Sequence, residues 1–221
     1  MTNSNFTPLI YTPSSENDLK KKAKEFREKM NSRRSVRFFS DKDVDKSIIE
    51  DIVMTASSAP SGAHKQPWTF CVVSSIEIKE KIREAAEKEE YDNYHGRMSD
   101  EWLKDLEKFE TDWHKEFLTK APYLIIIFKK VYDVLEDGTK SKNYYVNESV
   151  GIAAGFLISA IHMAGLVTLT HTPSPMNFLQ EILSRPENER AFLLLPVGYP
   201  AVGVEVPVLE RKTADQVLIW H

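Results

Sequence analysis

The hydrophobic residues of this chain follow two spacings, one typical of helices and one typical of buried strands. A capped, highly charged helix is predicted from Ser15, and apolar positions every three to four residues predict further helices over residues 45–59, 76–94, 98–118, 146–164 and 177–184. Unbroken apolar runs predict strands over residues 69–75, 122–128, 166–170 and 191–200, with a turn at 136–142. Because strands and helices alternate, we expect an α/β (α+β) domain in which helices flank a mixed sheet.

The most hydrophobic segment, residues 150–169, is about as long as a membrane span. It nevertheless contains Ser159 and His162, is rich in glycine and alanine, and becomes β-branched in its second part. These features favour a buried helix that leads into a strand. Gly151 and Gly155 lie four residues apart, a spacing that lets two helices approach closely. A helix that is apolar on all sides must be covered, so we predict a homodimer.

Length and charge limit the kind of protein further. A chain of 221 residues with 42% hydrophobic residues fits one domain, which we place at residues 15–221 after a flexible arm of residues 1–14. The net charge of −4 argues against binding to nucleic acid or to an anionic membrane. The extended segment 204–221 has little sequence left to fold back on, so we expect it to dock on a partner subunit.

Cysteine content and the first residues bear on location. Cys71 is the only cysteine, which excludes disulfides within the chain, and no Cys and His residues have zinc-ligand spacing. The N-terminus lacks the charged start and apolar stretch of a signal peptide. We therefore expect a cytoplasmic protein without a metal site.

The stretch "RRSVRFFSD" concentrates hydrogen-bond donors in Arg33, Arg34, Ser35 and Arg37. A guanidinium matches phosphate oxygens two at a time. The chain has no glycine-rich phosphate loop, so a phosphate-bearing ligand would have to be held by side chains such as these. Taken alone, the cluster also fits a solvated basic turn after the first helix.

Four motifs together resemble the nitroreductase-like flavoprotein superfamily: "RRSVRFFSD", "APSGAHKQPWTFCVV", "GLVTLTHTP" and "LLPVGYP". Within it, "APSGAHKQPW" and the segment 88–118 are similar to the family of iodotyrosine deiodinases. The resemblance extends from about Arg33 to the C-terminus. It implies an intertwined homodimer with FMN at the interface and a C-terminal extension on the partner subunit.

The resemblance also implies which residues bind the flavin. The ribityl phosphate would be held by Arg33, Arg34, Ser35 and Arg211. The flavin ring would be contacted by Arg37 near N1 and O2, by Pro60, Ser61, Thr170 and His171, and by the Thr172 hydroxyl at N5. A fixed cation near N1 stabilises the charge that reduction leaves there, and a donor at N5 favours single-electron steps. The backbone N–H of Ala63 would face the phenolate oxygen of the substrate, which makes Thr172 and Ala63 the catalytic candidates.

The segment 88–118, which we call the lid, indicates the substrate class. Glu90 and Tyr94 lie four residues apart and share a helix face, and Lys115 comes from the next predicted helix. By resemblance, Glu90 would bind the ammonium of an amino-acid zwitterion, and Tyr94 and Lys115 its carboxylate. Singly, each of these residues also fits a solvated helix face.

These features predict an FMN-dependent reductive dehalogenase that converts halotyrosines, such as 3-iodotyrosine, to tyrosine and halide. Its partners would be a second copy of the chain, a halotyrosine or related phenolic amino acid, and an unidentified electron donor or reductase. One alternative is a broad-substrate nitroreductase or flavin reductase, which needs no role for Glu90, Tyr94 and Lys115. Another is a non-catalytic, flavin-bound sensor of tyrosine-like ligands.

Overall fold

The chain, seen in a computed structural model that describes residues 6–221, divides into two compact units, one ending at Arg33 and the other spanning Arg34–His221. The predicted domain of residues 15–221 therefore spans both units. Of the predicted arm of residues 1–14, the first five lie outside the described residues, and the others form neither helix nor strand.

The N-terminal unit contains the helix α1 (Glu16–Asn31), which confirms the helix predicted from Ser15. The Ser15 hydroxyl accepts a hydrogen bond from the backbone N–H of Asp18 at 3.2 Å. This is the usual N-cap arrangement, and it satisfies a donor that the first helical turn leaves free. No residue between Glu16 and Asn31 is buried, as expected of so charged a helix.

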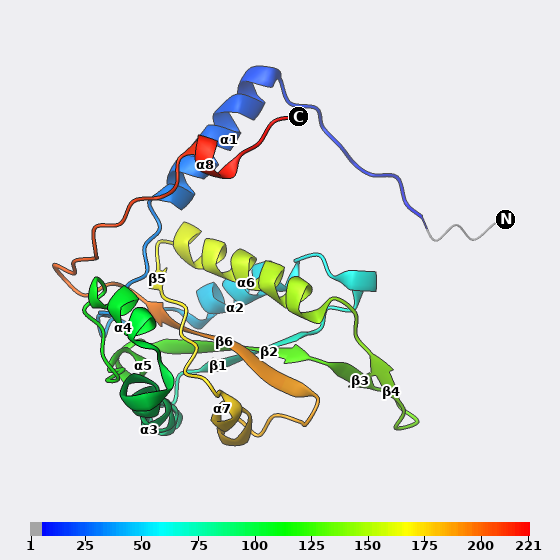
Figure 1. Ribbon diagram of the computed structural model, residues 1–221. Coiled ribbons are helices and arrows are strands. Elements are labelled where there is room, and N and C mark those ends of the chain that lie inside the picture. Colours follow the sequence, from blue (N-terminus) through cyan, green and yellow to red (C-terminus); the bar gives the residue numbers. More distant parts are fainter. Residues whose placement is uncertain (1–5) are drawn as a thin grey trace. The chain divides into compact units, whose positions relative to one another are not determined.

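The second unit is built on a four-stranded sheet in the order β1-β2-β6-β5 (Figure 1). Its strands are β1 (Trp68–Val73), β2 (Tyr123–Lys130), β6 (Glu189–Gly198) and β5 (Val167–Thr168). Neighbouring strands pair antiparallel. A parallel bridge joins Ser35 to Thr168, so the segment that contains the arginine cluster lies beside β5.

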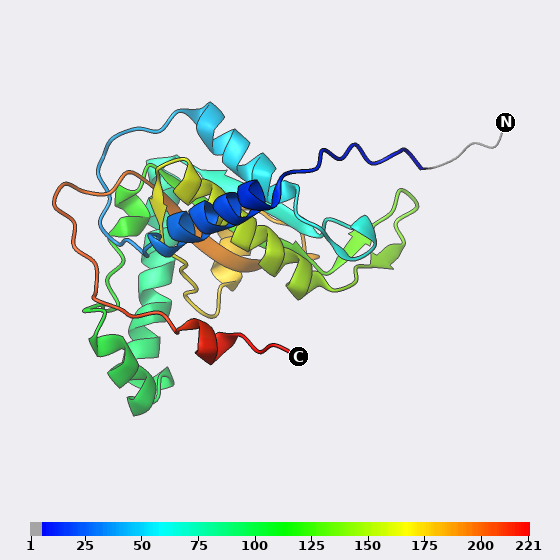
Figure 2. The ribbon, with the colours of Figure 1, turned by 90° about the horizontal axis from the view of Figure 1, so that it is seen from above.

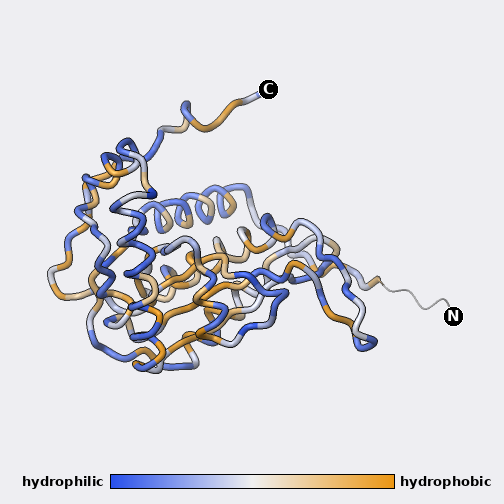
Figure 3. Tube along the Cα trace, turned by 60° about the horizontal axis from the view of Figure 1, so that its bottom comes forward, coloured by the Kyte–Doolittle hydropathy of each residue, from blue (hydrophilic) through white to orange (hydrophobic). Residues whose placement is uncertain are grey.

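Alternation along β2 divides the apolar residues between the two faces of the sheet. Ile125 and Ile127 belong to the core under α2 (Lys46–Ser57) and α6 (Val146–Met163). The intervening Leu124, Ile126 and Phe128 belong to the core on the opposite face. That core is covered by α3 (Ile76–Asp92), α5 (Phe117–Lys120) and α7 (Asn177–Ile182). The helices thus lie in two layers around the sheet, and hydrophobic residues follow its strands (Figures 1, 2 and 3).

The single helix predicted over residues 98–118 is wrong. The structure has α4 (Asp100–Glu107), an irregular stretch over 108–116, and then α5. Within that stretch Glu110 has a φ of 47°, which an α-helix does not allow. The apolar spacing continued through this region because Phe109 and Trp113 are still partly buried, although the backbone has left the helix.

Two further differences concern strands. The turn predicted at 136–142 belongs to a hairpin formed by β3 (Tyr132–Val134) and β4 (Lys140–Lys142). Between residues 204 and 221 the structure has no strand and one short helix, α8 (Ala214–Val217). Docking of this segment on a partner subunit stays a prediction.

Candidate functional site

A cavity of about 630 Å³ lies between α3, α4, the irregular stretch before α5, and the chain that follows β5. It brings together seven of the residues predicted for the site, from four separate parts of the sequence: Arg37, Glu90, Tyr94, Lys115, Thr170, His171 and Thr172. The residues predicted to bind the amino-acid end of a substrate thus share one cavity with part of the predicted flavin set.

Two of these residues form a buried ion pair. The Lys115 Nζ lies 3.4 Å from a carboxylate oxygen of Glu90, and the residues are 4% and 7% exposed. Loss of hydration raises the pKa of Glu90 and lowers that of Lys115, because burial disfavours the charged form of each. Each charge opposes that effect on the other. Separating the pair without a replacement partner would leave two buried charges uncompensated.

Tyr94 lies beside this pair because α3 is followed directly by a wider turn, η2 (Asn93–Arg97). Its hydroxyl donates to the carbonyl oxygen of Thr111 at 3.2 Å, and its ring centre is 5.3 Å from the Lys115 Nζ. The same Nζ also donates to the carbonyl oxygen of Asp112. Burial raises the pKa of Tyr94, so its hydroxyl stays a hydrogen-bond donor at neutral pH.

Arg37 enters the cavity because its segment is fixed at both ends by backbone pairing. The Val36 N–H donates to the carbonyl oxygen of Thr168 at 3.1 Å, and Phe39 bridges to Pro200. Burial lowers the pKa of Arg37, whose guanidinium lies 5.6 Å from the centre of the Phe109 ring. An arginine stays charged at any ordinary pH despite such a shift.

His171 is 7% exposed, and its backbone N–H and carbonyl oxygen both pair with Leu194, at 2.9 and 3.1 Å. Its N–H is therefore already used, and only its carbonyl lone pair or its ring can meet a ligand. The ring Nε2 is buried and has no hydrogen-bond partner among residues 6–221. Burial, reinforced by the charges of Lys115 and Arg37, lowers the pKa of His171 to about 3, so the ring is neutral.

The charged groups of the cavity are unequal in number. Arg37, Lys115 and Arg97 face it as cations, and Glu90 faces it as a carboxylate. The Arg97 guanidinium is already paired outside the cavity with Glu89 at 2.6 Å and with Asp92 at 3.1 Å. Two cations and one carboxylate therefore remain to meet a ligand, which favours one with net negative charge and an ammonium group.

The residues predicted to hold a phosphate are less concentrated. Arg34 donates to the carbonyl oxygen of Pro207, which ties the C-terminal segment to this arginine. Ser35 is exposed beside β5, and Arg211 lies on the exposed segment four residues after Pro207. Arg33 is the last residue of the N-terminal unit.

Pro60, Ser61 and Ala63 lie outside this cavity, in a loop before β1. The loop rests on the start of α6, where the Gly62 N–H donates to the Ser149 hydroxyl at 3.3 Å. In Figure 1 it lies toward the end of the sheet where β3 and β4 project, whereas α3 and α4 lie toward the other end. Within the second unit, the Pro60–Ala63 loop therefore lies apart from the predicted flavin residues that line the cavity.

Two contributions to the cavity were not predicted from the sequence. Phe117 meets the His171 ring edge-on, with ring centres 5.3 Å apart, and closes the cavity floor beside Lys115. Phe117 falls within the helix predicted over residues 98–118, whose apolar spacing indicated only that such a residue is buried. The Thr111 carbonyl, which holds Tyr94, belongs to the backbone, so no side-chain pattern could have identified it.

Comparison with known proteins gives consistent results. The sequence model of the nitroreductase family matches residues 30–199. An iodotyrosine deiodinase from Haliscomenobacter hydrossis is 63% identical over 98% of this chain and 97% of its own length, and one from Hydra vulgaris is 47% identical over 96% and 79%. The crystal structure of oxidized iodotyrosine deiodinase bound to FMN and 3-iodo-L-tyrosine superposes with a TM-score of 0.73, at 27% identity, covering 85% of this chain and 96% of that one.

Proposed function

The chain belongs to the nitroreductase family, and we propose that it is an FMN-dependent enzyme that removes iodide reductively from 3-iodotyrosine. The observation that carries this function is the group of Glu90, Tyr94 and Lys115, with a buried ion pair and a partly buried phenol, in one cavity with Arg37. A general reductase of nitroarenes needs no such set. An amino-acid zwitterion carrying an anionic ring matches its charges.

The binding of the amino-acid end follows from the ion pair. The ammonium of the substrate would take the place of Lys115 beside Glu90, and the substrate carboxylate would pair with Lys115 and the Tyr94 hydroxyl. One ion pair of the free protein is thus exchanged for two pairs with the ligand, so no buried charge is left uncompensated. Binding would therefore hold the lid closed and exclude water from the ring.

The residues present fit FMN on two observations. The buried Nε2 of His171 has no partner within residues 6–221, and the cavity has more cations than carboxylates. Arg37 would stabilise negative charge on the flavin ring, and the Thr172 hydroxyl would donate to N5. The side chains that would hold the phosphate and the ring edge are Arg33, Arg34, Ser35, Arg211, Pro60, Ser61, Thr170 and His171.

The reaction breaks the carbon–iodine bond of the ring and forms a carbon–hydrogen bond, consuming two electrons and one proton. When bound, reduced FMN supplies the two electrons. The Ala63 N–H would hold the phenolate oxygen so that the ring keeps one orientation. A separate electron donor or reductase must then restore the reduced cofactor.

A second copy of the chain would complete the site. The helix α6 is long and apolar enough to cross a membrane, but only a third of it is buried. Ile152, Phe156 and Met163 are exposed on it. A Cβ added at Gly151 or Gly155 would meet nothing within 4 Å among the described residues, so this face is open to a close neighbour. In a homodimer it would be covered, and the partner's copy of the Pro60–Ala63 loop could reach the cavity.

The decisive experiment is anaerobic. The purified, FMN-loaded protein is reduced with dithionite, 3-iodotyrosine is added, and iodide release is followed together with reoxidation of the flavin. Stoichiometric iodide and tyrosine are expected. Binding without iodide release would instead indicate a sensor, and turnover of nitroarenes without binding of 3-iodotyrosine would indicate a general nitroreductase.

A further inference from the structure

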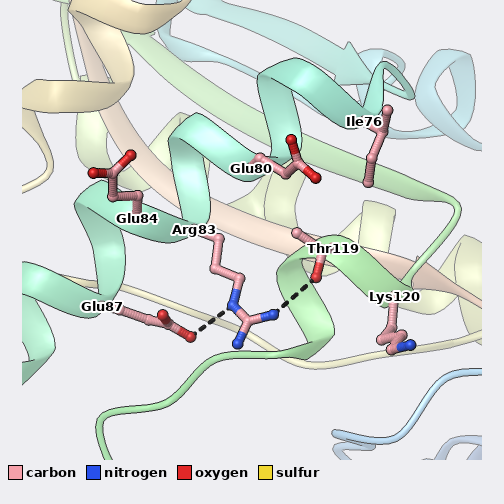
Figure 4. Close-up of a pocket in the computed structure, with 7 residues that line it drawn as sticks. All are labelled: Ile76, Glu80, Arg83, Glu84, Glu87, Thr119 and Lys120. Carbon is pink, nitrogen blue, oxygen red and sulfur yellow. Dashed lines mark hydrogen bonds and ion pairs between the residues drawn. The ribbon is translucent and has the colours of Figure 1, made fainter.

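The stretch that carries Lys115 is attached to α3 by polar contacts outside the cavity. Figure 4 shows the part of this network that joins Arg83 to Glu87 and Thr119. A carboxylate oxygen of Glu87 accepts from the backbone N–H of Lys115 at 2.7 Å and from the Arg83 Nε at 2.7 Å. Arg83 in turn donates to the Thr119 hydroxyl at 3.2 Å. One carboxylate therefore ties the backbone at Lys115 to the helix, and an arginine holds that carboxylate.

Glu87 and Glu90 lie three residues apart on α3, so they are neighbours on the helix surface. Lys115 is consequently held twice by the same helix, by its N–H at Glu87 and by its Nζ at Glu90. A lysine side chain is long and flexible, so the position of its backbone decides where the ammonium can reach. When a zwitterion replaces the contact between Lys115 and Glu90, the bond to Glu87 remains.

The fold around this stretch has supports of its own. The Lys79 Nζ donates to the carbonyl oxygen of Ala121 at 2.9 Å, and Phe117 and Leu118 are buried in the core. Loss of Glu87 would therefore release the backbone near Lys115 without releasing α5. This separates a role in placing Lys115 from a role in folding.

We propose that Glu87, supported by Arg83, is a positioning residue that keeps Lys115 beside Glu90, ready for the amino-acid end of the substrate. The inference rests on the proposed function. It predicts that changes at Glu87 affect substrates that carry the zwitterion and leave the flavin and ring chemistry unchanged.

The test compares Glu87→Ala and Glu87→Gln with a matched control, Glu84→Ala, in the FMN-loaded protein. Glu84 lies three residues before Glu87 on α3 and lines the surface pocket drawn in Figure 4, where no interaction joins it to the other residues drawn. The Kd of 3-iodotyrosine is measured by quenching of flavin fluorescence, and kcat and KM by iodide release. The dehalogenation of 2-iodophenol, which has no amino-acid group, is measured in parallel.

In Glu87→Ala we expect Kd and KM for 3-iodotyrosine to rise about tenfold, the loss typical of one hydrogen bond to a charged acceptor, with kcat little changed. Glu87→Gln should restore most of the affinity, because its amide oxygen can still accept from the Lys115 N–H. FMN content and 2-iodophenol turnover should match those of Glu84→Ala. In a Lys115→Ala background, Glu87→Ala should have no further effect on Kd.

Two results would overturn the inference: a Glu87→Ala protein that binds 3-iodotyrosine like the control, or one that loses FMN and 2-iodophenol turnover to the same extent. If the wild type binds 3-iodotyrosine but releases no iodide, the proposed activity fails, and the Kd ratio still decides the role of Glu87. If the wild type does not bind it, both proposals fail.

Discussion

The lid side of the cavity and the Pro60–Ala63 loop were both predicted to belong to one site. They differ in how many of their groups find partners within a single chain. In the cavity, the charges of Glu90 and Lys115 are buried and paired with each other. In the loop, Pro60 and Ala63 are exposed, and Ala63 has a φ of 51°. His64 and Gln66 follow it in the same left-handed region, which non-glycine residues seldom adopt.

In the proposed homodimer, this difference indicates where a second copy would contribute. The charges of Glu90 and Lys115 and the hydroxyl of Tyr94 find partners within one chain, so amino-acid recognition depends on residues of the lid itself. The loop and the open face of α6 have side chains and backbone groups directed to solvent. A backbone held in an unfavourable conformation is typical of ligand sites. We therefore expect lid variants to alter substrate affinity and variants of the α6 face to alter assembly and cofactor retention.

The largest effect is expected from Phe156→Asp on the exposed face of α6. A carboxylate buried in an apolar interface is costly, so the variant should become monomeric, lose its FMN and show less than about one-thousandth of the wild-type iodide release. Light scattering after size-exclusion chromatography measures the mass, and absorbance near 450 nm measures the flavin.

The matched control is Ile76→Asp, at a residue with similar exposure, 45% against 40% for Phe156, at the start of α3. An aspartate in the first turn of a helix is favourable, so this variant should remain dimeric and yellow. A dimeric, active Phe156→Asp protein would contradict the assignment of this face to an interface.

The next largest effect distinguishes a role of the lid in binding the substrate from a role in the flavin chemistry. Glu90→Gln keeps the shape of the side chain and removes the charge that the substrate ammonium would meet. We expect kcat/KM for 3-iodotyrosine to fall about 100-fold, because a buried ammonium loses its ion partner, while nitroarene reduction changes less than about twofold. An equal loss in both reactions would place Glu90 in general catalysis or folding and remove the basis for amino-acid recognition.

The sequence alone predicted these two regions unequally. The strands β1, β2 and β6 and the helices α2, α3 and α6 follow from apolar spacing, because each buries a continuous face in the core. The three lid residues were selected by resemblance, and the structure brings all three into one cavity. The apolar spacing did not predict that the helix breaks between Glu107 and Phe117, where a backbone group bonds to a distant side chain, as the Lys115 N–H does to the Glu87 carboxylate.

In the loop before β1, the sequence indicated the motif but not its backbone conformation. Its residues were quoted as a motif, and only the structure reveals the left-handed backbone at Ala63 and His64. Such conformations are usually indicated by glycine, and here the glycine of the motif, Gly62, precedes them instead.

The cavity also predicts an acid-dependent loss of stability. Because the pKa of His171 falls from 6.5 in the unfolded chain to about 3 in the folded protein, its contribution is fully present above pH 6.5 and is lost as pH falls toward 3. When the pH falls from about 7 to about 4.5, the free energy of unfolding of the wild type should fall by about 2–3 kcal/mol more than that of His171→Leu. Urea denaturation at both pH values measures this.

Leu194→Val provides the control for that measurement, since it alters packing next to His171 without adding or removing a titrating group. It should lower the free energy of unfolding by the same amount at both pH values. If His171→Leu and the wild type show the same acid profile, the ring of His171 is hydrated or charged in solution, and the electrostatic account of the cavity is wrong.

The smallest effect concerns the strained loop. Glycine adopts the left-handed region without the steric cost that alanine incurs, so Ala63→Gly should raise the free energy of unfolding by about 0.5–1 kcal/mol. The backbone N–H that would face the substrate is retained, so iodide release should persist. Ala85→Gly, inside α3, should have the opposite sign, a loss of about 0.5–1 kcal/mol, because glycine is a poor helix former. If both variants destabilise the protein equally, the left-handed backbone at Ala63 is absent in solution, and the loop resembles the cavity in being relaxed within one chain.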